Sequence, residues 1–357
     1  MKKQPKKKNI TKSILSRINA FVALLLLLSY LSPHLPADVF WPISMLGLAY
    51  PAFLLLNLIF TVFWLVFRSR YILISLVSVL IGWNHVGNHI NILPETKEPV
   101  PDSSFMVMSY NVQSGSGNKH LTSRNEVFHI IEKANADVIL FQELYFSPAK
   151  FKTYSQSYPG MKNIKAVNHH NGSNLLSASR FPSLKKGFLS SEGGVFALFT
   201  DLVIHDDTLR FYNIQLASNY LDEEKSIFDQ GFQINDPESQ KQASSIIRKL
   251  KRGYQTRTAE VEILTSHIQD SPFPVVLGGD FNDTPMSYAY HQIKKTGLTD
   301  SFKKSNKAGM SNTHNENLPP IRIDYILHDK KYKTVSYNRL SESASDHFPV
   351  TAIISKQ

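Results

Sequence analysis

The chain of 357 residues has no cysteine. Disulfide bonds, and zinc or iron–sulfur sites built on thiolates, are therefore excluded. Acidic residues are scarce at the amino terminus, where residues 1–70 hold nine Lys or Arg and one acid, Asp38. That segment carries +8 of the net charge of +10, and the other 287 residues carry about +2. The bulk charge after residue 70 is not that of a nucleic-acid-binding domain, although a local basic cleft is compatible with it.

Charged residues are also absent from long runs within the first ninety residues. Ile18 to Leu35 is mostly apolar, Trp41 to Phe67 has 27 residues without a charge, and Tyr71 to about Val86 is a third apolar run. A membrane-spanning helix needs about 20 apolar residues. Buried core helices are one alternative, and the first run also has the basic start and leucine core of a signal peptide. Three such runs so close together favour about three transmembrane helices in residues 1–92.

The distribution of basic residues predicts how these helices are oriented. Seven Lys or Arg precede the first run, Arg68 and Arg70 lie between the second and third, and the loop from Pro33 to Pro42 has none. Because basic segments stay in the cytoplasm, the amino terminus is expected there, and three crossings leave the chain after residue 90 outside. Residues 93–103 are expected to link this multi-pass anchor to an extracytoplasmic domain, periplasmic or extracellular, at 104–357.

The run from Pro274 to Asp283, Pro-Val-Val-Leu-Gly-Gly-Asp-Phe-Asn-Asp, is the most informative part of that domain. Its β-branched start predicts a buried strand, which the two glycines are expected to end. In an α/β fold, polar groups at the carboxyl end of such a strand face a ligand-binding crevice. An extended chain would point Asp280 and Asn282 the same way, towards a water or a phosphoryl oxygen beside a metal. An Asx-rich turn is the alternative, since Gly, Asp and Asn all favour turns.

The same order of helix, strand and terminal carboxylate occurs twice in the domain. In the first half, a strand at 105–112 is followed by a helix and by a strand at 137–141 that ends in Gln142-Glu143. In the second half, a helix at 239–268 leads into the strand before Asp280. The chain therefore predicts two similar α/β halves that deliver their acids to the same edge.

The remaining strands are predicted from apolar runs that are bounded by polar turns. They are 172–180, the hairpin of 195–204 and 209–216, 322–327, and 350–354. A polar loop is expected at 219–237. Asp324 lies within the strand at 322–327, and the polar turn Ser345-Asp346-His347 precedes the last strand.

A family resemblance emerges when these strand ends are taken together. The set is Tyr110-Asn111, Gln142-Glu143, Gly279-Asp280-Phe281-Asn282, Asp324 and Ser345-Asp346-His347, in that order. It resembles the endonuclease/exonuclease/phosphatase superfamily, which includes DNase I, over about residues 104–356. The resemblance implies a four-layer α-β-β-α sandwich, in which two packed β-sheets carry helices on their outer faces.

The resemblance also implies a metal site. Glu143 is expected to be the main metal ligand, assisted by Asn111 and Asp346. Carboxylate and amide oxygens without any thiolate suit a hard ion, so the expected cofactor is Mg²⁺ or Mn²⁺.

Catalytic roles follow from the same resemblance. Asp280 and Asn282 are expected to hold the attacking water and the scissile phosphate. His347 is expected to be the catalytic histidine, with Asp324 orienting its ring, because a His–carboxylate pair fixes the tautomer and stabilises the imidazolium. The other histidines of the domain, His314 among them, match no part of the pattern.

One position departs from the family pattern. Many members have a histidine in an Asn-x-His-Leu context, and this chain has Asn213-Ile214-Gln215-Leu216. Gln215 can donate and accept hydrogen bonds but cannot carry a charge. If the family histidine works through its charge, lower activity or an altered pH dependence is expected here. If that histidine only contacts phosphate, Gln215 can replace it.

The expected function is that of a membrane-anchored, divalent-metal-dependent phosphoester hydrolase at the outer face of the membrane. The substrate could be a nucleic acid or a phospholipid-like ester, and the weak bulk charge and the membrane tether favour a lipid or small phosphoester. A catalytically silent domain that binds a ligand or partner at the membrane is the alternative, which only Gln215 favours. Besides the substrate and the lipid bilayer, no protein partner is predicted.

Overall fold

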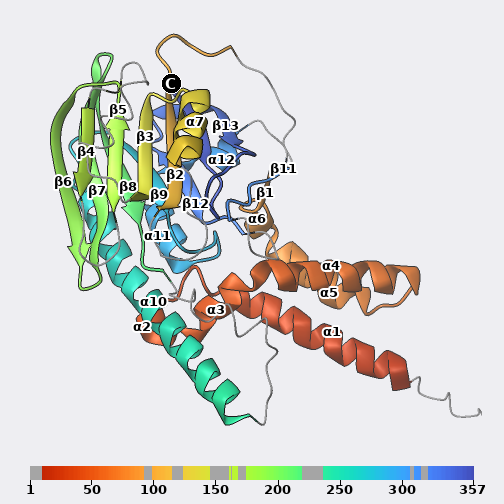
Figure 1. The fold of residues 1–357 in the computed structure, drawn as a ribbon. Coiled ribbons are helices and arrows are strands. Elements are labelled where there is room, and N and C mark those ends of the chain that lie inside the picture. The colour runs from red at the N-terminus through yellow and green to blue at the C-terminus, as the bar shows by residue number, and fades with distance from the viewer. Residues whose placement is uncertain are drawn as a thin grey trace, which may run out of the picture.

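The computed structural model describes residues 10–91, 99–114, 124–144, 161, 163–167, 174–218, 236–305, 309–314 and 321–357. Within these ranges the chain forms two six-stranded sheets, a two-stranded sheet of β1 (Ile90–Asn91) and β11 (Gly309–Met310), and a group of apolar helices at the amino terminus (Figure 1). The loop predicted at 219–237 lies almost entirely outside the described residues, as does part of the linker predicted at 93–103.

The first large sheet contains the strand that ends at Asp280. Its order is β10-β12-β9-β8-β7-β6. The strands are β6 (Ser183–Ser191), β7 (Gly194–Ile204), β8 (Asp207–Gln215), β9 (Val275–Asp280), β10 (Thr299–Asp300) and β12 (Asp324–His328). Only β8 and β9 run parallel, because a long helix, α10 (Pro237–Gln269), returns the chain between them.

The second large sheet contains the strand of Glu143, and its order is β13-β14-β2-β3-β5-β4. The strands are β2 (Phe105–Ser114), β3 (Val138–Leu144), β4 (Asn163–Val167), β5 (Leu175–Ser179), β13 (Tyr332–Arg339) and β14 (Val350–Lys356). Here too a single pair is parallel, β2 with β3, and helix α7 (Arg124–Ala134) lies between them in the chain. The two halves that the sequence predicts are therefore the centres of the two sheets.

Alternate side chains along a strand pack in different layers of the sandwich. Along β2, Phe105 and Val107 face the other sheet, whereas Met108 and Tyr110 pack in the cluster under α7. The other sheet alternates in the same way, with its outer face under α10 and α11 (Tyr288–Lys295). The predicted α/β fold of two packed sheets with outer helices is confirmed.

Several elements were not predicted from the sequence. They are β4, β6, β13, α11 and the short helix α12 (Ser301–Lys304). Strand β6 is largely polar and partly exposed, and it forms because it pairs along its length with β7. An exposed strand at a sheet edge carries little apolar periodicity, so its sequence resembles a loop.

The two glycines of β9 lie inside the strand, which continues to Asp280, so the expectation that they end it is wrong. A Cβ on Gly279, whose φ is 152°, would lie 2.0 Å from the carbonyl oxygen of Ile214 on β8. A Cβ on Gly278 would lie 2.8 Å from the side chain of Leu140 on β3. Glycine is needed at both positions because β8 and the facing sheet approach β9 closely just before Asp280.

The amino-terminal helices α1 (Ile10–Ser29), α4 (Tyr50–Val66) and α5 (Ile72–Ile81) lie side by side and project away from the sheets (Figure 1). We call these three the helix bundle. Two short helices, α2 (Ala37–Phe40) and α3 (Pro42–Leu48), connect α1 to α4, and α6 (Trp83–Val86) follows α5. Most of the exposed large apolar side chains among the described residues lie in this part of the chain, and Val66 is 72% exposed. So much contiguous apolar surface marks an interaction with a membrane or a partner.

Fewer membrane spans are found than the three predicted. One helix, Thr11–Ser29, is long and apolar enough to cross a membrane. The second apolar run is bent by 58° between α3 and α4, so that the pair counts as one further span at most. The third run forms a helix of 10 residues, α5, and then the short α6. The number of about three spans is therefore not supported, because turns interrupt runs that are continuously apolar in the sequence.

The helix bundle packs against the sheet domain just after β9. Met286, which follows Asp280 in the loop between β9 and α11, is fully buried. It lies in one apolar cluster with Leu26 of α1, Leu54 of α4 and Val79 of α5. The loop that leaves the strand of Asp280 is thus anchored in all three helices of the bundle.

Candidate active site

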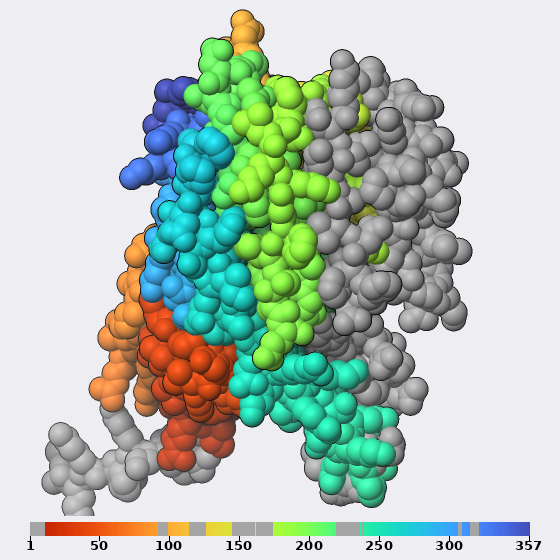
Figure 2. Space-filling model, turned by 90° about the vertical axis from the view of Figure 1, so that its left-hand side faces the viewer, coloured from red at the N-terminus to blue at the C-terminus, as the bar shows by residue number. Residues whose placement is uncertain are grey.

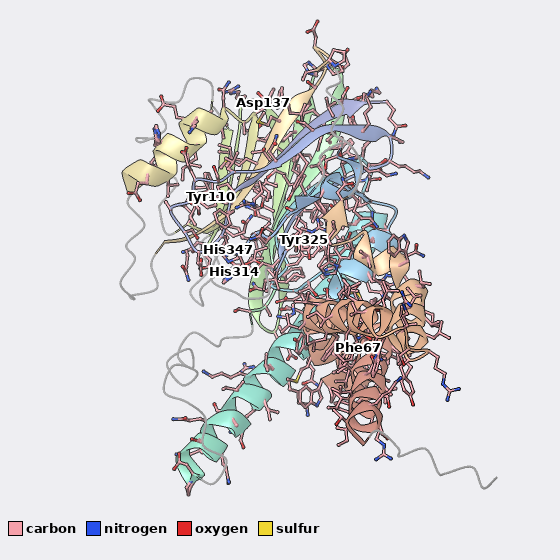
Figure 3. The ribbon with its side chains drawn as sticks, turned by 90° about the vertical axis from the view of Figure 1, so that its right-hand side faces the viewer. Phe67, Tyr110, Asp137, His314, Tyr325 and His347 are labelled. Carbon is pink, nitrogen blue, oxygen red and sulfur yellow. The ribbon has the colours of Figure 1, made fainter. Side chains whose placement is uncertain are left out.

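The predicted site residues come from strand ends that meet at one end of the sandwich. Both parallel pairs, β2–β3 and β8–β9, end there, and β12 begins there, with Asp324 opposite Asp280 in the ladder. Figure 3 shows His347 on the bundle side of the sheets, far from Asp137 at the start of β3. The hydrogen bonds and short ionic contacts described next connect Asn111, Glu143, Gln215, Asp280, Asn282, Asp324, Asp346 and His347.

His347 lies among three carboxylates. Its Nδ1 is 2.9 Å from Oδ2 of Asp324, and its Nε2 is 4.0 Å from Oδ2 of Asp280 and 3.9 Å from Oδ1 of Asp346. Burial by itself lowers the pKa of His347, but the charges of Asp324 and Asp280 outweigh burial and raise the pKa. The ring is therefore stabilised as an imidazolium, with Nδ1 donating to Asp324 and Nε2 facing the other two acids.

Asp280 connects the two sheets. Its Oδ2 accepts a hydrogen bond from Nδ2 of Asn111 at 3.0 Å, and its Oδ1 accepts one from the backbone N–H of Asn282 at 2.7 Å. Burial raises the pKa of Asp280, which the positive charge of His347 only partly offsets. A carboxylate in such surroundings is a stronger proton acceptor than one on the surface.

Asn282 does not extend alongside Asp280. Its φ is 50°, so the chain turns at this residue, and the expectation of parallel side chains fails because it required an extended chain. Instead Nδ2 of Asn282 donates to the carbonyl oxygen of Leu216 at 2.8 Å. This bond ties the ends of β8 and β9 together next to Gln215.

Glu143 accepts two hydrogen bonds from neutral amides. Nδ2 of Asn111 donates to Oε1 of Glu143 at 3.1 Å, and Nε2 of Gln215 donates to the same oxygen at 2.5 Å. Burial raises the pKa of Glu143, and these two hydrogen bonds act in the opposite direction. Glu143 also has a φ of 54°, which is uncommon for a residue with a side chain and often occurs at functional sites. Gln215, the residue that departs from the family pattern, is therefore hydrogen-bonded directly to the predicted metal ligand.

His314 is the residue of this site that the sequence pattern missed. Its ring is nearly perpendicular to that of His347, with 5.0 Å between the centroids, and its Nε2 is 3.7 Å from Oδ2 of Asp346. A backbone bridge pairs His314 with His347, and the hydroxyl of Thr313 accepts from the backbone N–H of Asp324 at 3.0 Å. No motif signals His314, because its place depends on a contact between segments that are far apart in the sequence.

Two buried tyrosines, both labelled in Figure 3, hold the segments that carry the site. The hydroxyl of Tyr110 on β2 accepts from the backbone N–H of Ala344 at 2.8 Å, just before Asp346. The hydroxyl of Tyr325 on β12 donates to the carbonyl oxygen of Asp283 at 2.9 Å, just after Asn282. Each tyrosine thus links a strand of the sandwich to an irregular segment that provides site residues.

The donor atoms of the site fit a hard divalent cation. Oε1 of Gln215 and Oδ1 of Asp324 are buried and have no hydrogen-bond partner among the described residues. One ligand atom from each of Asp280, Asp324 and His347 lies within 4.8 Å of the others. Oxygen donors with imidazole and no thiolate are the ligands that Mg²⁺ and Mn²⁺ accept.

The ligands that the resemblance implies fit less directly. Asn111 turns its NH₂ group towards Glu143 and Asp280, and its Oδ1 accepts from the backbone N–H of Gln113 at 3.1 Å. Ligation through Asn111 would therefore require the amide to rotate, because only its oxygen binds a cation. His314, Asp346 and His347 form a second group of close ligand atoms, and Glu143 belongs to neither group.

The profile of the endonuclease/exonuclease/phosphatase family matches residues 108–347, which include every site residue named above. The chain belongs to this family. The profile of a domain of unknown function matches residues 12–89, the part that contains the helix bundle. A search of curated proteins found no match to the chain.

Solved structures of endonuclease/exonuclease/phosphatase proteins share the fold at low identity. A family protein from Bacteroides thetaiotaomicron has a TM-score of 0.50 at 17% identity, covering 72% of this chain and 96% of that chain. One from Beutenbergia cavernae has a TM-score of 0.51 at 15% identity, covering 71% of this chain and 72% of that chain. A humanised D. rerio TDP2 has a TM-score of 0.50 at 14% identity, covering 71% and 100%. Identities this low support the fold and leave the substrate open.

Proposed function

We propose that this protein is a membrane-anchored, divalent-metal-dependent hydrolase of phosphoesters. The observation that carries the proposal is the buried His347, whose Nδ1 bonds Asp324 and whose Nε2 faces Asp280. Members of the family use such a constellation to hydrolyse phosphoesters. A structural role alone would not account for two buried acids and a buried histidine that meet at the strand ends beside Asp346.

Different side chains of the site would serve different steps when water attacks phosphorus. The water must lose a proton, which Asp280 can take, and His347 can take it only when its ring is the neutral imidazole. Held by Asp324, the ring of His347 can instead offset the charge that develops on the phosphoryl oxygens. Asn282, through its bond to Leu216, keeps the end of β9 in place beside the substrate position.

Glu143, assisted by Asn111 and Asp346, would hold the divalent ion. When bound, the ion neutralises phosphate oxygens and makes phosphorus more electrophilic. Gln215 orients Glu143 through a hydrogen bond from a neutral amide, and this bond lowers the pKa of Glu143 against the effect of burial. A histidine in this position would place a second titratable group on the same carboxylate.

The alternative is a catalytically silent domain that binds a ligand, and Gln215 is the observation that favours it. The two proposals predict different results when a panel of substrates is tested with the full chain in nanodiscs, with Mg²⁺ or Mn²⁺ added. The panel contains DNA, RNA, sphingomyelin, phosphoinositides and a chromogenic diester. Turnover of any of them that needs the metal supports the hydrolase, and binding without turnover across the panel supports the silent domain.

The test of mechanism is a double-mutant cycle. His347→Ala and Asp324→Asn should each lower turnover, His347→Ala by at least about a hundredfold, the scale for losing an acid–base group. The double variant should be no worse than His347→Ala, because both residues act as one unit. His129→Ala, on the exposed face of α7, is the matched control. Equal turnover by His347→Ala and the wild type would refute the assignment.

We also propose that the helix bundle anchors the protein and that the hydrolase domain lies outside the cytoplasm. The apolar α1 and the exposed side chains of α4 and α5 support the anchor. Either one or three crossings would put the domain opposite the basic amino terminus, which stays inside. A reporter that is active only outside the cytoplasm, fused after Gln357, should be active. Activity of a cytoplasmic reporter there would instead require two crossings.

The substrate that fits this arrangement is a phosphoester at the membrane surface, such as a phospholipid-like ester. The loop after Asp280 and Asn282 is anchored in the bundle through Met286, so the site lies near the anchor. Balanced charge after residue 70 also favours this substrate over nucleic acid.

A further inference from the structure

The amino-terminal half of α10 carries an exposed basic stripe that has no place in the site chemistry. Lys241, Arg248, Lys251 and Arg252 are all exposed and lie on one side of the helix. None of the four makes an ion pair with any residue in the described part of the chain. No acid occurs between residues 239 and 259 of the helix. We call these four residues the basic stripe.

The opposite side of the same helix half is apolar and packs on the connection between α1 and α4. Leu250 and Tyr254 form a buried cluster with Ala37 of α2, with Trp41 and Met45 packed against it. Thr258 accepts a hydrogen bond from the backbone N–H of Ala37 through its hydroxyl at 3.3 Å. The helix is therefore fixed to the base of the bundle, and Figure 2 shows its amino-terminal half extending to the level of the amino-terminal helices.

The other half of α10 holds the two loops that border the site. Nη1 of Arg257 donates to the carbonyl oxygen of Ala217 at 2.6 Å, and Nε of Arg257 is 3.3 Å from Oδ2 of Asp283. Glu260 accepts from the backbone N–H of Ala217 at 2.8 Å. Ala217 and Asp283 follow the strands of Gln215 and Asp280, so a displacement of α10 would reach both strand ends.

We propose that the basic stripe of α10 binds the anionic phosphate headgroups of the membrane in which the bundle is anchored. The proposal rests on the membrane anchoring proposed above. Charge complementarity supports it, since basic residues near an anionic bilayer are attracted to it. Ile247, which is 46% exposed beside the stripe, would enter the acyl boundary, as apolar residues of interfacial helices do.

This binding would set the orientation of the hydrolase domain. The bundle already holds the loop after Asp280 through Met286, and α2 holds α10 through Ala37. A second attachment through α10, whose carboxyl half holds the site loops, would keep the site directed at the lipid surface. The basic stripe is therefore assigned to lipid and not to a nucleic-acid substrate, which would also need basic residues along the site itself.

The absence of cysteine makes the position of α10 directly measurable. Ile247→Cys, labelled with a fluorophore, gives one probe in the full chain, reconstituted in nanodiscs of phosphatidylcholine with or without phosphatidylglycerol. Lipids that carry a nitroxide on the headgroup should quench the probe in the anionic discs. Quenching should weaken in pure phosphatidylcholine and at high salt, because salt screens such attraction over about 10 Å or less. A probe at Lys185→Cys, on β6, should remain unquenched.

Charge variants supply the matched comparison. Changing all four residues of the basic stripe to Gln should abolish the quenching, since each basic residue changes binding by about fivefold. Changing Lys185, Lys186, Lys330 and Lys331 to Gln removes the same charge elsewhere and should leave quenching intact. Turnover of a soluble diester should stay unchanged in both variants, which shows that the site is folded.

Three results would overturn the inference. They are a probe at 247 that stays in water in anionic discs, quenching that is equal in both lipid mixtures, and quenching by a nitroxide-labelled oligonucleotide instead of lipid. A chain that does not enter nanodiscs at all would refute the anchor and the stripe together. Absence of turnover in the wild type, with normal quenching, would refute only the proposed hydrolase.

Discussion

Glu260 of α10 should make the protein less stable as the pH rises through neutrality. The residue is 3% exposed, and its oxygens accept from the backbone N–H of Ala217 and from the hydroxyl of Ser191. Burial raises the pKa of Glu260 from 4.5 to about 7. The folded chain therefore keeps a proton that the unfolded chain has already released. Stability contributed by the neutral carboxyl is complete below about pH 4.5 and is lost as the pH rises to about 7.

The size of this loss follows from the two pKa values of Glu260. They differ by about 2.5, which at about 1.36 kcal/mol for each pKa unit amounts to about 3 kcal/mol above pH 7. Glu260→Gln mimics the neutral form, because its oxygen can accept from Ala217 and its NH₂ can donate to Ser191. The variant should be more stable than the wild type at pH 8, by up to about 3 kcal/mol, and similar to it at pH 4.5.

Thermal unfolding of the full chain in detergent, from pH 4.5 to 8, measures the effect. All three tryptophans lie at or before position 83, so near-ultraviolet circular dichroism of tyrosine is the better probe of the hydrolase domain. Glu262→Gln removes the same charge from the exposed face of α10 and should change the pH profile little. An increase in the free energy of unfolding of the wild type, relative to that of Glu260→Gln, between pH 5 and 7.5 would refute the reasoning.

Three further predictions concern the site. Glu143→Gln should sharply weaken metal binding and turnover, and unchanged Mn²⁺ titration by paramagnetic resonance would remove Glu143 from the metal site. Gln215→His should shift the pH profile of turnover towards the pKa of the new imidazole, and an unaltered profile would show that position 215 does not act through charge. Gly279→Ala should lower the unfolding temperature by several degrees and abolish turnover, because its Cβ would lie 2.0 Å from the carbonyl oxygen of Ile214. Gly297→Ala is the control, since a Cβ there would meet nothing within 4 Å and should cost only about 1 kcal/mol of backbone strain. Equal unfolding temperatures for the two glycine variants would contradict the close approach of β8 to β9.

Much of the site was predictable because strand ends are local features of the sequence. An apolar run that stops at an Asn, Glu or Asp predicts both a strand and a polar group at its end. Glu143 and Asp280 lie where such runs end. The order of the motifs along the chain then led to the family, whose profile matches 108–347. The roles of the individual residues stay predictions until they are tested.

The tertiary structure decided what the strand ends do to one another. Gln142 of one sheet donates to Oδ1 of Asn213 of the other at 2.7 Å, and such a bond cannot be inferred from either strand alone. His314 joins the site through a bridge to His347, and Gln215 reaches Glu143 across the sandwich. These contacts depend on the spacing of the two sheets, which is a property of the whole packed core.

The same distinction applies to the amino-terminal part of the chain. Composition by itself determined that residues before about 90 are apolar and that the basic residues precede them. The interruption at Ala49 and the shortness of α5 appeared only in the structure, as did the burial of Met286 among the helices. Hydrophobicity is a sum over residues and can be read along a sequence, whereas a bend or an interface depends on which surfaces pack together.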